Sequence, residues 1–173
     1  MGVTTSSNSA ATYVPLATST LGSAQATVTF NSIPSTYTDL VLITGDIINA
    51  TNLANAYLQF NSDTSGTYSA TFMEGSGSSG SGSRNSGQDR LKVLRSYGGD
   101  RTMNITNILN YSNNSFYKTI LGRYGSGGSS SSTGAAIGMW RSTSTISSIT
   151  IGIEGGYNFS TGATFTLYGI KAA

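Results

Sequence analysis

The sequence contains no histidine and no cysteine. Without these side chains, the ligand sets typical of zinc, haem and iron–sulfur sites cannot be assembled. Nucleophilic catalysis of the Ser-His-Asp and Cys-His types is excluded as well. No disulfide can form, so the sequence does not indicate a redox compartment. The side chains that remain for catalysis are carboxylates and a few lysines and serines.

Charged residues are also scarce, because they make up only 9% of the 173 residues, against about 25% in an average soluble domain. Hydrophobic residues make up 37%, so the low charge does not indicate disorder, which combines low hydrophobicity with high net charge. Ser, Thr, Gly and Asn account for about half of the chain, and these residues favour turns or tolerate strands. The composition predicts an all-β protein, and the length predicts one domain.

The few charges are unevenly distributed along the chain. No Lys or Arg precedes Arg84, and five of the nine bases fall between Arg84 and Arg101. The acidic residues before Arg84 are Asp39, Asp46, Asp63 and Glu74. A nucleic-acid-binding domain would have a denser basic stripe with interleaved aromatic residues, so we expect no nucleic-acid partner. We predict instead that the acidic stretch 39–74 faces the basic cluster 84–101 of a neighbouring subunit.

Residues 1–12 have neither the basic start nor the apolar segment of a secretory signal. We predict that they form a flexible arm that becomes ordered on contact with a partner, followed by a single domain over residues 13–173. The longest aliphatic run is Leu40–Ile43, far shorter than the ~20 residues that span a bilayer. We therefore expect no membrane partner.

Strand-like segments alternate with turns rich in Gly, Ser and Asn. Ile149, Ile151 and Ile153 recur at every second position, which indicates one buried face per strand. The predicted strands are 24–30, 38–43, 56–60, 68–73, 103–111, 116–123, 135–141, 146–153 and 163–170. Residues 88–95 fit a short helix, and a strand fits them nearly as well. The intervals between segments favour an antiparallel β-sandwich of jelly-roll type, which protects strand edges.

Two stretches of low complexity, residues 75–83 and 125–134, consist almost entirely of Gly and Ser. Such sequences behave as flexible coil. The segments on either side of each stretch are strand-like, so we predict two long exposed loops within the one domain.

Two short motifs resemble binding sites but lack the context that such sites need. Gly75, Gly77 and Gly80 have the spacing of a dinucleotide-binding loop, but this Gly/Ser tract does not open a helix. Residues 61–66 (NSDTSG) resemble the start of a calcium loop, but the twelfth position is Phe72 where that loop needs Glu. We interpret 61–66 as a polar turn and predict neither a cofactor nor a metal site.

Glu74 and Glu154 are the carboxylates that could flank a sugar bond in a glycosidase. Glu74 leads into the predicted loop 75–83, where a catalytic group would be held imprecisely. We therefore assign no catalytic residue and expect no enzyme activity.

Trp140 has two interpretations. Its neighbours Ile137 and Met139 favour a residue of the core or of a subunit interface. In the alternative, its ring stacks on a sugar together with exposed tyrosines.

Four sequence segments and their order along the chain resemble those of small virion proteins of tailed bacteriophages. They are SIPSTYTDLVLITGDI (32–47), FNSDTSGTYS (60–69), GMWRSTSTISSITI (138–151) and FTLYGIKAA (165–173). The resemblance extends from about Tyr13 to Ala173 and includes no catalytic signature. The most similar members are jelly-roll head decoration proteins, also called cement proteins.

The resemblance implies a homotrimeric knob on the capsid exterior, with the major capsid protein as its partner. The implied location is the virion, after synthesis in the host bacterial cytoplasm. Other proteins of similar type belong to tail fibres and receptor-binding appendages. Binding of a host receptor or of a surface glycan is therefore the alternative function.

Overall fold

The computed structural model describes residues 12–49, 54–128 and 132–171. Every regular element within these ranges is a β-strand, which confirms the all-β prediction. The strands are β1 (Tyr13–Thr20), β2 (Thr27–Phe30), β3 (Asp39–Asn49), β4 (Ala54–Phe60), β5 (Tyr68–Ser76), β6 (Ser79–Gln88), β7 (Leu91–Gly98), β8 (Thr102–Leu109), β9 (Lys118–Ser126), β10 (Ser132–Trp140), β11 (Ile149–Ile153) and β12 (Thr164–Ile170). The arm predicted over residues 1–12 lies, apart from Thr12, outside the described residues.

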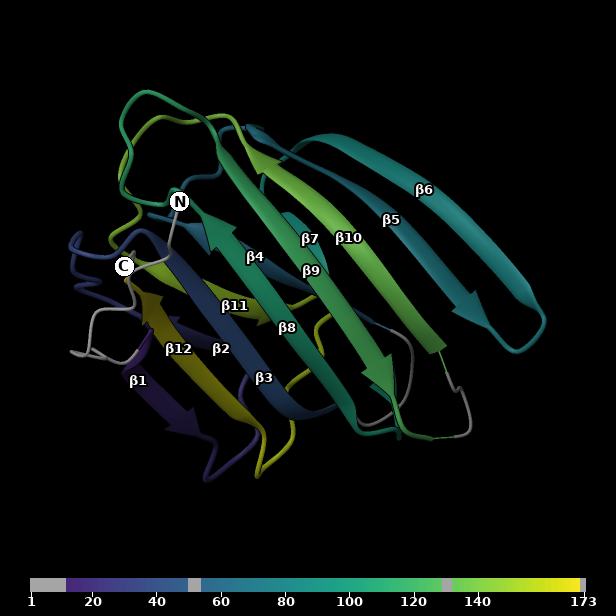
Figure 1. The fold of residues 1–173 in the computed structure, drawn as a ribbon. Coiled ribbons are helices and arrows are strands. Elements are labelled where there is room, and N and C mark those ends of the chain that lie inside the picture. Colours follow the sequence, from purple (N-terminus) through teal and green to yellow (C-terminus); the bar gives the residue numbers. More distant parts are fainter. Residues whose placement is uncertain (1–11, 50–53, 129–131, 172–173) are drawn as a thin grey trace, which may run out of the picture.

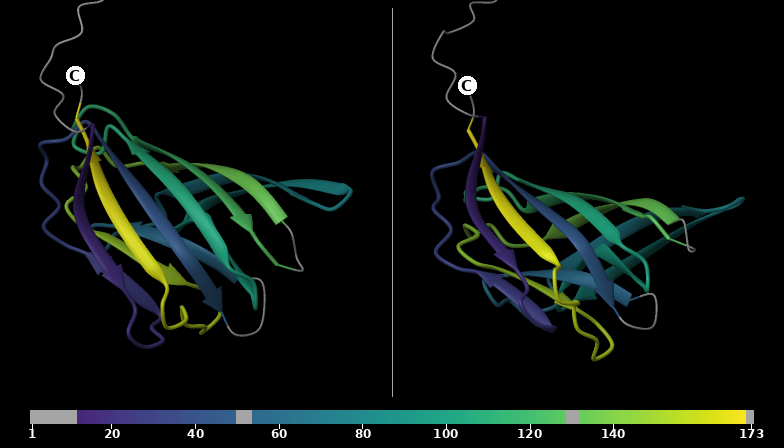
Figure 2. Two further views of the ribbon diagram at one scale, coloured as in Figure 1. Left: turned by 60° about the horizontal axis from the view of Figure 1, so that its bottom comes forward. Right: turned by 90° about the horizontal axis from the view of Figure 1, so that it is seen from below.

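The strands form two sheets that pack face to face as a sandwich (Figures 1 and 2). The large sheet is antiparallel and has the order β1-β12-β3-β8-β9-β10-β5-β6. The small sheet is antiparallel as well, with the order β2-β11-β4-β7. A short parallel pairing of β3 with β7, at Ile48↔Tyr97 and Asn49↔Gly98, joins the two sheets.

The strand order is consistent with a jelly roll. In chain order, β1, β2, β3, β4, β7, β8, β11 and β12 are taken as the eight strands of the roll. The first then lies beside the eighth, and the second lies beside the seventh, as they do when a long hairpin is rolled up. The other four strands, β9, β10, β5 and β6, extend the large sheet beyond the roll.

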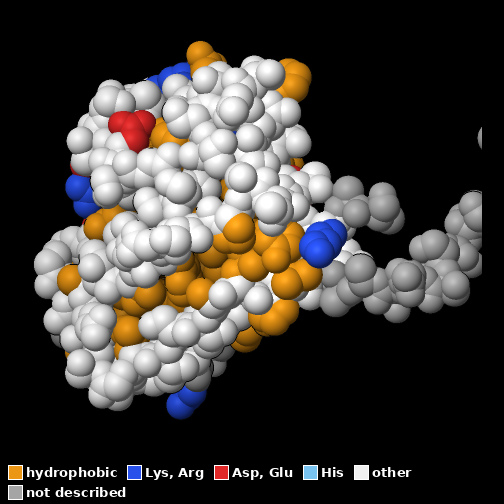
Figure 3. All heavy atoms as spheres, turned by 90° about the vertical axis from the view of Figure 1, so that its left-hand side faces the viewer, with side chains coloured by type: hydrophobic (Ala, Val, Ile, Leu, Met, Phe, Trp, Pro, Cys, Tyr) orange, Lys and Arg blue, Asp and Glu red, His pale blue; other side chains and the backbone are white. Residues whose placement is uncertain are grey.

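The core lies between the two sheets, where every second residue of most strands is buried. Ile149, Ile151 and Ile153 of β11 all point into it, which confirms the predicted alternation. At the side where the edge strands β1 and β2 lie, apolar side chains between the sheets reach the surface (Figure 3). Leu16 and Ala17 of β1 are only partly buried there and pack against the core.

The predicted loop over residues 75–83 is wrong, because this stretch forms the end of a β-hairpin. Strands β5 and β6 pair from Ser76↔Ser79 to Thr71↔Arg84 around a two-residue turn. Gly77 in that turn has a φ of 56°, a conformation that glycine adopts without strain. Ladder hydrogen bonds join backbone groups, so a strand of Gly and Ser can pair although it has no side chains to bury.

The second low-complexity stretch, 125–134, also contributes residues to two strands at its ends. Strand β9 continues to Ser126 and β10 begins at Ser132, while residues 129–131 lie outside the described residues. Of the two interpretations of residues 88–95, the strand is confirmed and the helix is wrong. Leu91 and Val93 of β7 are both fully buried, one strand period apart.

Two glycines allow β7 to pack closely against the inner face of the large sheet. A Cβ atom on Gly122 of β9 would lie 2.7 Å from the carbonyl oxygen of Val93, and one on Gly138 of β10 would lie 2.7 Å from a methyl group of Leu91. Real Cβ atoms do not approach other heavy atoms so closely. The distance between the sheets at this point is therefore set by the absence of two side chains.

We predict that Gly122→Ala lowers the free energy of unfolding by about 1–3 kcal/mol, because the new methyl group must displace the backbone of β7. Gly125→Ala on the same strand is the matched control. Its Cβ would lie 3.8 Å from Thr133, an ordinary contact, and we expect a change within about 0.5 kcal/mol. Urea unfolding of both variants measures the difference, and equal midpoints would contradict the prediction.

Candidate functional site

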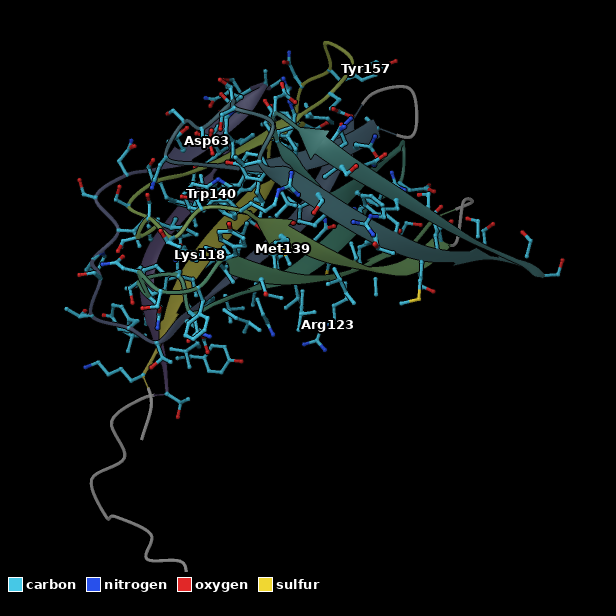
Figure 4. All side chains as sticks on the ribbon, turned by 90° about the horizontal axis from the view of Figure 1, so that it is seen from above. Asp63, Lys118, Arg123, Met139, Trp140 and Tyr157 are labelled. Carbon is cyan, nitrogen blue, oxygen red and sulfur yellow. The ribbon has the colours of Figure 1, made fainter. Side chains whose placement is uncertain are left out.

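One broad face of the large sheet is not covered by the small sheet. We call the surface formed by β5, β6, β8, β9 and β10 on that side the outer face. Large apolar side chains on it are between 40% and 58% exposed, namely Met73, Met103, Leu121, Ile137 and Met139. Figure 4 shows the side chain of Arg123 extending from this face away from the sandwich.

The strand register brings the apolar residues of the outer face together. Ile137 of β10 lies opposite Leu121 of β9. Two residues along, Ala135 lies opposite Met73 of β5 on one side and Arg123 of β9 on the other. Because neighbouring strands are about 4.8 Å apart, these side chains form one continuous apolar strip across three strands.

Two hollows lie on the strip and share Ile137. The larger hollow is about 290 Å³ and is lined by Met73, Asn107, Leu121, Arg123, Ala135 and Ile137 with backbone of Gly122 and Ala136. The smaller hollow is about 170 Å³ and is lined by Ser69, Ala70, Thr71, Arg84, Thr119, Ile137, Gly138 and Met139. Each hollow therefore combines apolar side chains with one arginine.

The outer face carries positive charge and no negative charge among its described residues. Arg84 of β6 and Arg123 of β9 are its charged side chains, and neither has a hydrogen bond or an ion pair within the described chain. The one acidic residue of these five strands, Glu74, is in contact with Tyr124 and Arg95 on the opposite side of the sheet.

The candidate carboxylates Glu74 and Glu154 belong to one polar network that passes through Arg95. The hydroxyl of Tyr124 donates to Glu74 Oε2 at 2.6 Å, and Arg95 Nε lies 3.2 Å from the same oxygen. Glu154 pairs with Lys92 at 2.9 Å and accepts a hydrogen bond from Asn55 at 3.0 Å. Arg95 also donates to Asn55, so the two carboxylates are connected through it.

One pair of this network joins the acidic stretch to the basic cluster within the same chain. Glu74 of the acidic stretch pairs with Arg95 of the basic cluster within one chain. Asp89 pairs in the same way with Arg90 at 2.6 Å. The side chain of Asp46 lies outside the described set. The expected contact between the acidic stretch of one copy and the basic cluster of another stays a prediction.

The stretch 61–66, which resembles the start of a calcium loop, is a polar turn stabilised by the carboxylate of Asp63. Asp63 Oδ1 accepts hydrogen bonds from the backbone N–H and the hydroxyl of Ser65, and Oδ2 accepts from Thr67 and Trp140. Phe72, at the twelfth position of the motif, is a core residue. Among the described residues, no group of three or more potential metal ligands is present.

Trp140 is a core residue, so the sugar-stacking interpretation of this side chain is wrong. Its ring is 2% exposed, stacks on Tyr68 and lies 5.5 Å from Phe60. Its indole N–H donates to Asp63 at 2.6 Å, as the neighbouring positions of the two residues in Figure 4 show. The hydrogen bond satisfies the one polar group of a buried tryptophan.

Sequence reasoning did not identify a role for Lys118, whose side chain is fully buried. Its ammonium group donates to the carbonyl oxygens of Asn113, Phe116 and Thr143. Burial lowers the pKa of Lys118, because removal from water disfavours the charged form. The three carbonyls belong to two loops, so Lys118 holds the loop before β9 against the loop after β10.

No protein-family model, curated protein or solved structure matches the chain. Within the described ranges, no helix has the length and apolar character needed to cross a membrane. The outer face, with its apolar strip, two hollows and two unpaired arginines, is the candidate functional site.

We predict that Asp63→Asn destabilises the protein and weakens its response to acid. Burial by itself raises the pKa of Asp63, but the hydrogen bonds from Ser65, Trp140 and Thr67 outweigh burial and lower the pKa from 3.8 to about 2. Since the folded pKa lies below the unfolded value, the stabilisation is complete above about pH 4 and is lost as the pH falls towards 2. An amide accepts at one atom only, so the two donors that contact the other oxygen lose their acceptor, at a cost of about 1–3 kcal/mol each.

Urea unfolding at pH 6 and at pH 2.5 measures both effects. Asp39→Asn is the control, because that carboxylate accepts a single hydrogen bond, from the backbone of Asn110, which an amide oxygen can also accept. We expect the stability difference between the wild type and Asp63→Asn to be large at pH 6 and small at pH 2.5. A difference that stays constant with pH would contradict the assignment.

Proposed function

We propose that this protein is a non-catalytic structural protein of a tailed-bacteriophage virion. It decorates the head shell by docking its outer face onto the major capsid protein, and so stabilises the shell. The observation that carries the proposal is the exposed apolar strip on the outer face. Contiguous exposed apolar patches on soluble proteins often mark sites that bind a partner.

The position of the strip supports a docking role. It lies on adjacent strands of one antiparallel sheet, whose backbone is fixed by ladder hydrogen bonds on both sides. A surface on regular strands is held more precisely than one on loops. Binding therefore orders little of the protein, and the interaction energy is available for affinity.

Stabilisation of the shell follows from mass action. A protein that binds the assembled shell but not its dissociated subunits shifts the equilibrium towards the shell. This role needs no reaction chemistry. In the proposed arrangement the chain is a homotrimer on the capsid exterior, as the sequence resemblance implies, and it is made in the host bacterial cytoplasm.

The alternative, a tail module that binds a host receptor or glycan, has lost its main support. Trp140 was the strongest candidate for stacking on a sugar, and its ring is buried. Phe116 and Tyr117 remain exposed in the loop before β9. The alternative is therefore retained only as an outcome of the experiment that follows.

The number of copies per virion tests the proposed location. We expect quantitative mass spectrometry of purified virions to give a fixed ratio to the major capsid protein, near one or a simple fraction set by capsid symmetry. A ratio lower by an order of magnitude or more would place the protein on the tail and overturn the proposal.

The use of the outer face is tested by Ile137→Asp, which places a charge at the centre of the strip. We expect this variant to lose most of its occupancy on shells, because the carboxylate must be desolvated on docking. Thr29→Asp is the matched control, since Thr29 is exposed on the outward side of the small sheet. Equal occupancy of the two variants would show that another surface binds the shell.

A further inference from the structure

The apolar strip of the outer face lies between two arginines. Arg84 of β6 pairs with Thr71 of β5, which pairs in turn with Ile137. Arg123 of β9 lies on the far side of Ile137, two residues along the strands. Three strand spacings and two residues separate the Cα atoms of the two arginines, a distance of about 16 Å.

Each arginine has its own hollow, and the two hollows differ in chemistry. Arg123 lies beside Met73, Leu121 and Ala135, so its hollow is mainly apolar. Arg84 shares its hollow with Thr71 and Thr119, whose hydroxyl groups are neutral hydrogen-bonding groups. Beside apolar surface, a guanidinium group binds a carboxylate through two parallel hydrogen bonds more strongly than it does in open water.

Other arginines of the chain are already engaged. Arg90 pairs with Asp89, Arg95 pairs with Glu74, and Arg141 donates to Ser69 and to the carbonyl oxygen of Gly66. Arg84 and Arg123 have no such partner among the described residues. Arginine is also enriched in protein interfaces, and it is frequent among the hot-spot residues that contribute most of the binding energy.

We infer that the outer face binds an acidic protein surface, on which two carboxylates flank an apolar ridge. The carboxylates bind Arg84 and Arg123, and the ridge lies on the strip beside Ile137. This inference rests on the proposed function, because it specifies the chemistry of the surface on the head shell that the outer face docks onto.

A second copy of the chain does not fit this description. Its described acidic side chains are engaged within the chain, including Asp39 with Asn110 and Asp63 with Trp140. In a symmetric contact between two outer faces, the same arginines would also approach one another. Like charges brought together at an interface cost several kcal/mol. Charge complementarity therefore favours a different protein as the partner.

The test uses shells that lack the protein, to which the full-length chain is added back. We expect Arg84→Glu and Arg123→Glu each to weaken shell binding at least about tenfold, and the double variant to weaken it further. Lys171→Glu is the matched control. It changes the net charge by the same amount, but Lys171 lies beyond β12 and contacts Tyr37. Shell binding of the wild type should also weaken with added salt, and that of an Arg84→Gln, Arg123→Gln double variant should weaken less.

A second measurement separates this inference from the proposed function. Two soluble peptides, one alternating Glu with Leu and one alternating Lys with Leu, are titrated into isotope-labelled protein and followed by NMR. We expect the acidic peptide alone to shift the backbone signals of β5, β9 and β10. Circular dichroism of every variant confirms that it is folded.

The outcomes are distinguishable. If the wild type does not bind shells but the acidic peptide shifts the outer face selectively, the proposed function fails and the inference stands. If the wild type binds shells and the double Glu variant binds equally well, the inference fails and the proposed function stands. An equal response to both peptides overturns the inference. Self-association that Ile137→Asp abolishes also overturns it, because a second copy would then occupy the face.

Discussion

The close packing of β7 against β9 and β10 is the contact on which the rest of the structure depends. The large sheet has four strands beyond the jelly-roll-like part, and β7 of the small sheet packs against the inner side of three of them, β9, β10 and β5. Gly122 and Gly138 permit this approach, and Leu91 and Val93 fill the space between the sheets. With much of its inner face packed in this way, the extension of the large sheet presents its outer face to solvent.

The sequence predicted the strands wherever side chains alternate between a buried and an exposed face. The isoleucines of β11 are the clearest example, because apolar residues at every second position fit a strand with one buried face and do not fit a helix. The hairpin of β5 and β6 could not be predicted in this way. Its Gly and Ser residues have no apolar face, and the hydrogen bonds that hold it involve backbone atoms alone. Polar or small composition therefore does not by itself distinguish a loop from an exposed strand.

The candidate site was less accessible to sequence reasoning, because its residues come from different strands. Met73, Leu121 and Ile137 are far apart in the chain and meet only through the register of β5, β10 and β9. Sequence reasoning favoured a core or interface position for Trp140 from its apolar neighbours, and the structure places it in the core. The role of Lys118 could not be predicted from the sequence, since the three carbonyl groups that bind its ammonium are backbone groups of two loops.

The composition of β10 supports the proposal that a partner covers the outer face. A strand with one face in water alternates apolar and polar residues, whereas a strand covered on both faces is a continuous apolar run. From Ala135 to Trp140 the sequence AAIGMW has no polar side chain. Its inward residues pack in the core, and its outward residues Ile137 and Met139 are exposed in the isolated chain. The strand thus has the composition of a doubly covered strand, which supports the proposed docking role, and Arg84 and Arg123 are the groups that we propose select an acidic partner.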